Sequence, residues 1–382
     1  MEAVQAPIIS VVADLINRYP GTISLGQGVV RYGPPPSALE RIRSFVPSDT
    51  VNKYGPTGGI EPLRDIIAAK LEAENRIPTG ADSCIMVTAG SNMAFVHTLF
   101  AITRRGDEVI LPVPYYFNHE MAITMLDCHA VPVATGDAYL PQPEDIRRAI
   151  TRRTRAIVTV SPNNPSGMVY SEQCLREINA LCAEHGLYHI SDEAYEYFTY
   201  DGARHFSPGG IPGAGRHTIS LYSLSKAYGF AGWRIGYMVA PRHLLEALNK
   251  IQDTNLICPP AITQHAALGC LEAGRSYCER QLAGLRDVRR IILDELGRAS
   301  GEYFSLQPGA GAFYLLLKIN SAQDDMTVVE RLIREHRVAV IPGHTFGLTH
   351  GCYLRLAYAA LDAKNAREGI NRLTHGLNAV VE

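Results

Sequence analysis

A lysine lies among serines and an arginine in segment 220–237, which reads SLYSLSKAYGFAGWRIGY. Lys226 follows the apolar run HTISLYSL, and a charge carried into apolar surroundings is costly unless it is paired or neutralised. Such a lysine can lose its proton readily and act as a nucleophile. The hydroxyls of Ser223 and Ser225 and the guanidinium of Arg234 are groups that bind phosphate. The segment indicates a reactive lysine beside an anion site, although a surface lysine on a loop has the same local sequence.

Three further polar clusters follow apolar runs. TAGSN places Gly90, Ser91 and Asn92 at the start of a predicted helix, where free backbone N–H groups favour an anion but where an ordinary helix cap is also common. ISDEAY places Asp192 at the end of an apolar run, either as a helix cap or as the partner of a cation. VSPNNPSG reads alone as a plain turn.

The elements around these clusters alternate between strands and helices, which predicts βαβ units, a mostly parallel sheet and the α/β class. Ligands bind beyond the carboxyl ends of such strands, so all four clusters are expected on one rim. The predicted strands are 84–90, 107–114, 129–134, 154–160, 187–195, 217–226 and 234–241, and the helices are 62–74, 91–103, 119–126, 143–150, 171–186 and 241–251.

The pattern changes after about residue 275. A long helix over 275–296 precedes three strands and a final helix, which predicts a second, smaller α+β domain. We expect residues 1–40 to form an N-terminal arm and part of the small domain, residues 41–274 the large domain, and residues 275–382 the small C-terminal domain.

The composition narrows the range of partners. The formal net charge of the 382 residues is -2, so we expect binding neither to nucleic acid nor to an anionic membrane. The eight cysteines are scattered, which favours reduced thiols and a cytoplasmic location. The first residues lack a secretory signal, and no apolar run is long enough to span a bilayer.

Three segments in one order, NPSG, SDEAY and SLSKAYGFAGWRIG, resemble the class I/II aminotransferases of fold type I, which depend on pyridoxal 5'-phosphate. The resemblance extends from SLGQG near Leu25 to YLRLAYA near Arg355. It implies a sheet of the seven-stranded type between helices, with a small domain built from the N-terminal segment and the C-terminal third. It also implies ping-pong transfer of an amino group between an L-amino acid and a 2-oxo acid.

The resemblance implies catalytic roles for three residues. Lys226 matches the lysine that forms a Schiff base with the cofactor aldehyde and moves a proton. Asp192 matches the carboxylate that keeps the pyridine nitrogen protonated, so that the ring can accept electrons. Tyr195, together with Asn164, matches the donors to the phenolic oxygen of the ring.

Further residues of this sequence match positions that bind the cofactor or the substrate in the aminotransferase family. Tyr116 matches the aromatic residue stacked on the ring, with Phe117 as the alternative, and Tyr54 matches a tyrosine that reaches the phosphate of a neighbouring subunit, which implies a homodimer with shared sites. Arg355 matches the arginine that binds the substrate α-carboxylate, beside Gly28 and Asn164. The phosphate positions are Gly90, Ser91, Asn92, Ser223, Ser225 and Arg234.

Two departures from the family pattern bear on the substrate. The chain reads GVVRYGPPP where relatives often read GEPDF, so the roles of Arg31 and Tyr32 are open, substrate selection among them. Asn92 stands where aspartate-specific relatives of one subgroup carry a lysine for a distal carboxylate, which weakens an aspartate assignment. The amino donor and the oxo acid stay open.

Competing motifs have weaker support. SLSK fits Ser-x-x-Lys of penicillin-recognising enzymes, but the Lys-Thr-Gly partner is missing from the sequence. Cys182, His185 and His189 suggest zinc, but Gly186 breaks the helix between the histidines, and we expect no metal. The Gly-x-Gly at Gly309 leads into a strand, unlike a dinucleotide fingerprint. A regulator that reads DNA would carry a basic tract, and this sequence has none. A C–S lyase, a cyclopropane-forming synthase or an oxidase on the same scaffold stays an alternative.

Overall fold

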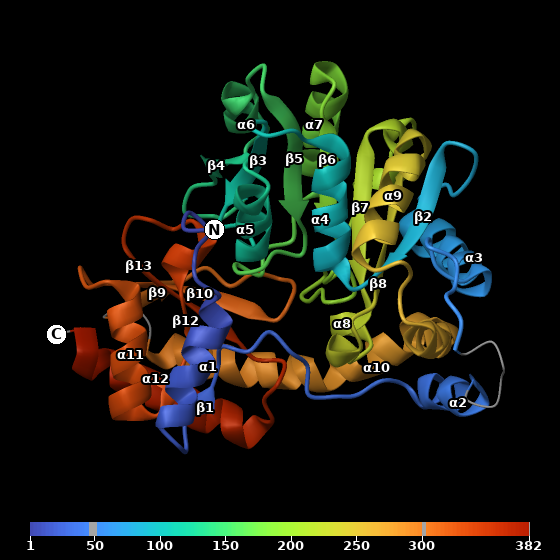
Figure 1. Ribbon diagram of the computed structural model, residues 1–382. Coiled ribbons are helices and arrows are strands. Elements are labelled where there is room, and N and C mark those ends of the chain that lie inside the picture. Colours follow the sequence, from blue (N-terminus) through green and yellow to red (C-terminus); the bar gives the residue numbers. More distant parts are fainter. Residues whose placement is uncertain (46–51, 300–302, 382) are drawn as a thin grey trace.

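A seven-stranded sheet forms the centre of the computed structural model, which describes residues 1–45, 52–299 and 303–381 (Figure 1). Its strand order is β2-β8-β7-β6-β5-β3-β4. Only β8 among these strands runs antiparallel to its neighbours, so the prediction of a mostly parallel α/β sheet is confirmed. The strands are β2 (Ser83–Thr88), β3 (Glu108–Val113), β4 (His129–Ala134), β5 (Thr154–Val160), β6 (Tyr188–Asp192), β7 (Thr218–Ser223) and β8 (Gly236–Pro241).

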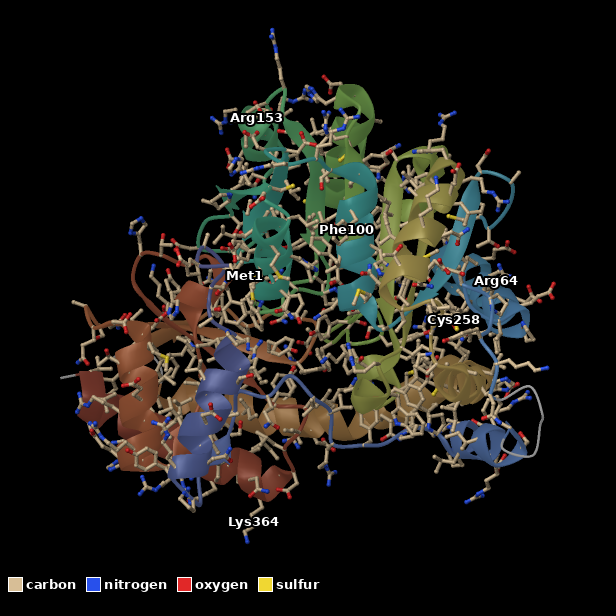
Figure 2. All side chains as sticks on the ribbon, viewed as in Figure 1. Met1, Arg64, Phe100, Arg153, Cys258 and Lys364 are labelled. Atoms are coloured by element: carbon tan, nitrogen blue, oxygen red, sulfur yellow. The ribbon has the colours of Figure 1, made fainter. Side chains whose placement is uncertain are left out.

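Helices cover both faces of this sheet, and each face has its own apolar core. On one face pack α4 (Ser91–Ile102), α5 (Phe117–Met125) and α9 (Leu245–Asn255), and on the other α6 (Pro143–Ala149) and α7 (Glu172–His185). Side chains fill the space between these layers (Figure 2). Because both faces are covered, the central strands carry apolar runs, such as residues 156–158 in β5, as buried parallel strands do.

A second, antiparallel sheet with the order β12-β13-β10-β9 is built from the C-terminal third. A short parallel pair, β1 with β11, joins the N-terminal segment to this part of the chain, as the sequence predicts. The strands are β1 (Ile23–Ser24), β9 (Phe304–Leu306), β10 (Tyr314–Ile319), β11 (Val338–Ala339), β12 (Ile341–Pro342) and β13 (Cys352–Ala357), and the helices beside them are α1 (Ile8–Arg18), α11 (Asp325–His336) and α12 (Ala363–Val381).

The helix α10 (Ala261–Ala299) runs beneath both sheets in Figure 1. Two helices meet end to end at a break at Gly274, where φ is 61° and ψ is -167°. The helical segment therefore begins at Ala261, whereas the sequence predicts a start near residue 275. That break falls at the boundary expected between the two domains and supports that boundary, which stays a prediction. The helices α2 (Pro36–Phe45), α3 (Glu61–Lys70) and α12 pack against α10.

No helix in the described ranges combines the length and the apolar character that crossing a membrane requires.

Candidate active site

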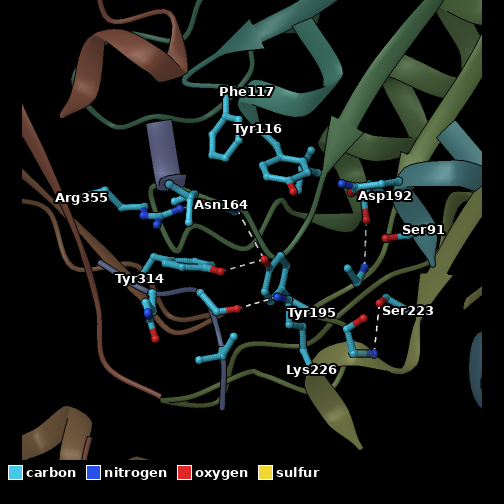
Figure 3. Close-up of a pocket in the computed structure, with 18 of the residues that line it drawn as sticks. Ser91, Tyr116, Phe117, Asn164, Asp192, Tyr195, Ser223, Lys226, Tyr314 and Arg355 are labelled. Atoms are coloured by element: carbon cyan, nitrogen blue, oxygen red, sulfur yellow. Dashed lines mark hydrogen bonds between the residues drawn. The ribbon is translucent and has the colours of Figure 1, made fainter. Parts of the chain in front are cut away.

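The carboxyl ends of β2, β5, β6 and β7 meet at one cavity of about 390 Å³. Figure 3 shows Arg355 at one end of it, Asp192, Ser91 and Ser223 toward the opposite end, and Tyr195 between them. The polar clusters therefore share one rim, as the strand pattern predicts. Twelve of the predicted residues line the cavity, namely Gly28, Ser91, Asn92, Tyr116, Asn164, Asp192, Tyr195, Ser223, Ser225, Lys226, Arg234 and Arg355.

Lys226 lies in the short helix α8 (Leu224–Ala227), directly after β7. Its Nζ donates a hydrogen bond to the carbonyl oxygen of Gly28 at 2.5 Å. Burial, helped by the positive charges of Arg355 and Arg234, lowers the pKa of Lys226 to about 8, although the carboxylate of Asp192 acts in the opposite direction. The amine is therefore available in its neutral, nucleophilic form to a much greater extent than an exposed lysine.

Asp192 is the last residue of β6 and is only 5% exposed. One carboxylate oxygen accepts from the backbone N–H of Ala194 at 3.1 Å, and the other lies 3.1 Å from Nε2 of His119. His119 is itself buried on α5, with its ring centroid 4.1 Å from that of Phe95. The histidine fixes the orientation of the carboxylate. The sequence gives no signal for this role, because nothing in YYFNHE distinguishes it from an ordinary helical histidine.

The N-terminus of α4 and the guanidinium of Arg234 form one end of the site. Gly90 precedes α4 with φ 85°, and a Cβ there would lie 2.5 Å from Nη2 of Arg234, so only glycine permits this approach. Nη1 of Arg234 lies 3.5 Å from Oγ of Ser225, and the Oγ of Ser223 accepts from the backbone N–H of Ser225. This end combines hydroxyls, a helix N-terminus and a guanidinium, the groups that bind phosphate.

Arg355 on β13 occupies the other end and is only 2% exposed. It donates to Oδ1 of Asn164 at 3.1 Å and to the carbonyl oxygen of Gly26 at 2.6 Å. Its guanidinium faces the rings of Tyr314 and Phe346, with centroids at 4.7 and 5.1 Å. Burial lowers the pKa of Arg355, and within the described ranges no carboxylate forms an ion pair with it. A buried cation without an anionic partner is suited to binding a carboxylate from solution.

Tyr195 and Tyr314 form a phenol pair in the middle of the site. Their hydroxyl oxygens are 2.9 Å apart, and Nδ2 of Asn164 lies 3.5 Å from the Tyr195 hydroxyl. Burial raises the pKa of Tyr195 well above its ordinary value, and it raises that of Tyr314 to about 12. Both phenols therefore keep their protons and can donate. Tyr314 is missed by sequence reasoning, because in AFYLLLKI it reads as an ordinary buried strand residue.

Four residues considered from the sequence for the cofactor, the substrate or substrate selection lie outside the cavity. Gly90 adjoins it through Arg234, whereas Tyr54 is 80% exposed at the surface of the chain. The side chain of Arg31 lines a separate cavity, and Tyr32 donates from its hydroxyl to the carbonyl oxygen of Lys226 at 3.0 Å. Tyr32 thus supports the backbone that carries the lysine.

The zinc interpretation finds no support in the described ranges. His189 is buried between Thr159 and Asn179, each within 3.0 Å of a ring nitrogen. The single group of described residues whose ligand atoms are close enough for a metal is Asp324, Asp325 and His344. There Asp324 caps α11 and Asp325 accepts from His344, so these carboxylates already have partners.

The charges lining the cavity fit the implied cofactor and substrate. Lys226, Arg234 and Arg355 are cationic, and Asp192 is the one carboxylate among the lining residues of the described chain. This surplus of positive charge suits two anionic groups at opposite ends, a phosphate at Arg234 and a carboxylate at Arg355. The amine of Lys226 could attach to an aldehyde, and the carboxylate of Asp192 could hold a pyridine nitrogen protonated.

Comparison with known proteins identifies the family. The model of aminotransferase class I and II matches residues 20–373. The chain belongs to this family. The aminotransferase is 35% identical to an aromatic aminotransferase, ISS1, of Arabidopsis thaliana, with 99% of this chain and 94% of the relative covered. It is 36% identical to an aspartate/prephenate aminotransferase of Thermus thermophilus, with 85% and 83% covered.

Solved structures agree with this assignment. The aspartate aminotransferase of Thermus thermophilus with maleate superposes on this aminotransferase with a TM-score of 0.90, at 31% identity and with 98% of each chain covered. The protein is therefore a pyridoxal-phosphate-dependent aminotransferase.

Proposed function

We propose that the enzyme moves an amino group between an L-amino acid and a 2-oxo acid by a ping-pong cycle in which Lys226 carries the cofactor as a Schiff base. The observation that carries the proposal is a buried amine of lowered pKa that shares one cavity with the carboxylate of Asp192 and with the guanidinium of Arg355, which has no carboxylate partner in the described ranges. When bound, pyridoxal phosphate supplies an electron sink for the bond that breaks at the substrate Cα.

The protein's own side chains would perform the remaining roles, which are proton transfer and control of the charge on the cofactor ring. Lys226 would hold the cofactor through its aldehyde, and the free amine of Lys226 would hold and move the proton of the substrate Cα. Asp192, oriented by His119, keeps the pyridine nitrogen protonated. Tyr195 and Asn164 would donate hydrogen bonds to the phenolic oxygen of the ring, and stabilising that oxyanion would lower the pKa of the imine.

Binding is divided between the two ends of the cavity. Tyr116 stacks on the ring, with Phe117 as the alternative, since both line the site. Arg355 binds the α-carboxylate with its planar fork, close to Gly28 and Asn164. The phosphate is held by Gly90, Ser91, Asn92, Ser223, Ser225 and Arg234.

A second subunit is part of the proposal. Tyr54 is a large aromatic residue left 80% exposed in the single chain, so its predicted role at the phosphate of a neighbouring site requires a homodimer. The cytoplasmic location stays a prediction.

The experiment compares the wild-type holoenzyme with Lys226→Ala and with Lys250→Ala, an exposed lysine on α9, as the control. We expect the wild type and the control to be yellow and to convert amino acids to oxo acids with amination of the cofactor. Lys226→Ala should lack the internal imine and lose turnover. Unchanged turnover in Lys226→Ala would refute the lysine's role, and ammonia release without cofactor amination would indicate a lyase or an oxidase.

A further inference from the structure

We propose that the site selects amino acids with uncharged, apolar side chains, aromatic ones included, over dicarboxylic amino acids. This rests on the proposed function, because it assigns Arg355 to the α-carboxylate and leaves the rest of the cavity for the side chain. The named relatives include both aromatic and aspartate enzymes, so the choice must be made from this chain's own residues.

Three apolar side chains form a wall of the cavity that also contains Arg355. Ile9 from α1, Val29 from the segment after β1, and Phe117 from the start of α5 all line the cavity. The ring of Phe117 lies 5.8 Å from that of Phe346, which in turn lies 5.1 Å from the guanidinium of Arg355. A substrate held at Arg355 therefore has apolar side chains close to its own side chain.

Part of this wall is incompletely covered by the rest of the chain. Ile9 and Val29 are each 37% exposed although both are apolar. An apolar substrate side chain lying against them removes apolar surface from water on both partners, and each methylene so buried is worth about fourfold in binding. A carboxylate in the same place would lose its hydration and gain no apolar contact.

The cations that line the cavity leave none for a second substrate carboxylate. Three cationic residues line the cavity, and the proposed function gives each of them a partner. Lys226 is assigned to the cofactor aldehyde, Arg234 to the phosphate and Arg355 to the α-carboxylate. Arg31 lies two residues after Val29 in the sequence, but it lines a different cavity. Within the described chain, a second substrate carboxylate would therefore lie in the site without a cation to pair with it.

The experiment uses the half-reaction, so that no acceptor influences the result. Wild-type holoenzyme is mixed with phenylalanine, leucine, methionine, alanine, aspartate or glutamate singly, and the loss of imine absorbance is followed together with oxo-acid formation. We expect second-order rate constants for phenylalanine, leucine and methionine to exceed those for aspartate and glutamate by about 100-fold or more.

Variants locate the selection on the wall. The double variant Ile9→Ala/Val29→Ala should slow phenylalanine and leucine about tenfold, while alanine, whose methyl group is too short to cover the wall, should change less than about twofold. Val29→Lys should raise the rate for aspartate relative to phenylalanine. Leu140→Ala, an exposed leucine outside the cavity, should change none of these ratios.

Two results would overturn the inference: dicarboxylic amino acids reacting as fast as apolar ones, or the double variant slowing alanine as much as phenylalanine. A failure of the proposed function looks different, because then no amino acid gives an oxo acid even though the imine absorbance is present.

Discussion

Replacing Arg355 by methionine should separate catalysis from stability. The guanidinium is buried, has no carboxylate partner in the described ranges and lines the cavity. A bound α-carboxylate would accept two charge-assisted hydrogen bonds from it, worth about 1.5–3 kcal/mol each. Their loss amounts to about 3–6 kcal/mol, and because 1.36 kcal/mol is tenfold in rate, we expect Arg355→Met to lower kcat/KM by about 10²–10⁴ for every amino acid.

The same change should leave the fold intact. The variant loses the bonds to Asn164 and Gly26, at about 1 kcal/mol each. It also loses the cation–π contacts of the guanidinium with the rings of Tyr314 and Phe346. Against these losses, it removes the desolvation cost of an unpaired buried cation, which is several kcal/mol. We therefore expect Tm to fall by no more than a few degrees.

The assay measures kcat/KM for several amino acids alongside Tm, with Arg280→Met, an exposed arginine outside the active-site cavity, as the control. Two results would refute the reasoning. A fall in kcat/KM of less than tenfold, or one confined to a single amino acid, would show that Arg355 does not bind the α-carboxylate. A large loss of Tm would show that its role is structural.

Two further variants test the interior of the site. Asp192→Asn should retain cofactor yet lose about 10²–10³ in kcat, because a neutral amide does not hold the pyridine nitrogen protonated; kcat near the wild-type value would show that the electron-sink role is wrong. The positive charge of Arg355 lowers the pKa of Tyr314 and so favours Tyr314 as the donor in its hydrogen bond with Tyr195. Tyr314→Phe removes that donor, which weakens the Tyr195 hydroxyl as a donor to the ring and should raise the pKa of the imine by up to about one unit. Absorbance titration of the holoenzyme checks this, with the buried Tyr139→Phe, outside the cavity, as the control; an unchanged or lowered pKa would contradict it.

The arrangement of the large sheet could be predicted because its strands carry two independent signals. Apolar runs such as AIVTV mark strands buried on both faces, and polar residues follow where each run ends. Since carboxyl ends of parallel strands share one edge, residues as distant as Ser91 and Ser223 could be placed on one rim. The structure brings both to the cavity.

Other features depend on tertiary contacts that leave no local pattern. His119 and Tyr314 act through Asp192 and Tyr195, which lie far from them in sequence. In sequence each has the pattern of an ordinary core residue. The antiparallel direction of β8 and the early start of α10 likewise depend on how the chain packs, since a strand's own residues do not encode its direction.

The central claim is that the cofactor is covalently attached to Lys226. Reducing the holoenzyme with borohydride converts the imine to a stable secondary amine, and peptide mass mapping then locates it. We predict the cofactor's mass on the peptide that contains Lys226 and on no other peptide. An adduct at another lysine, such as the buried Lys70, or no adduct in a yellow, active preparation, would contradict the account.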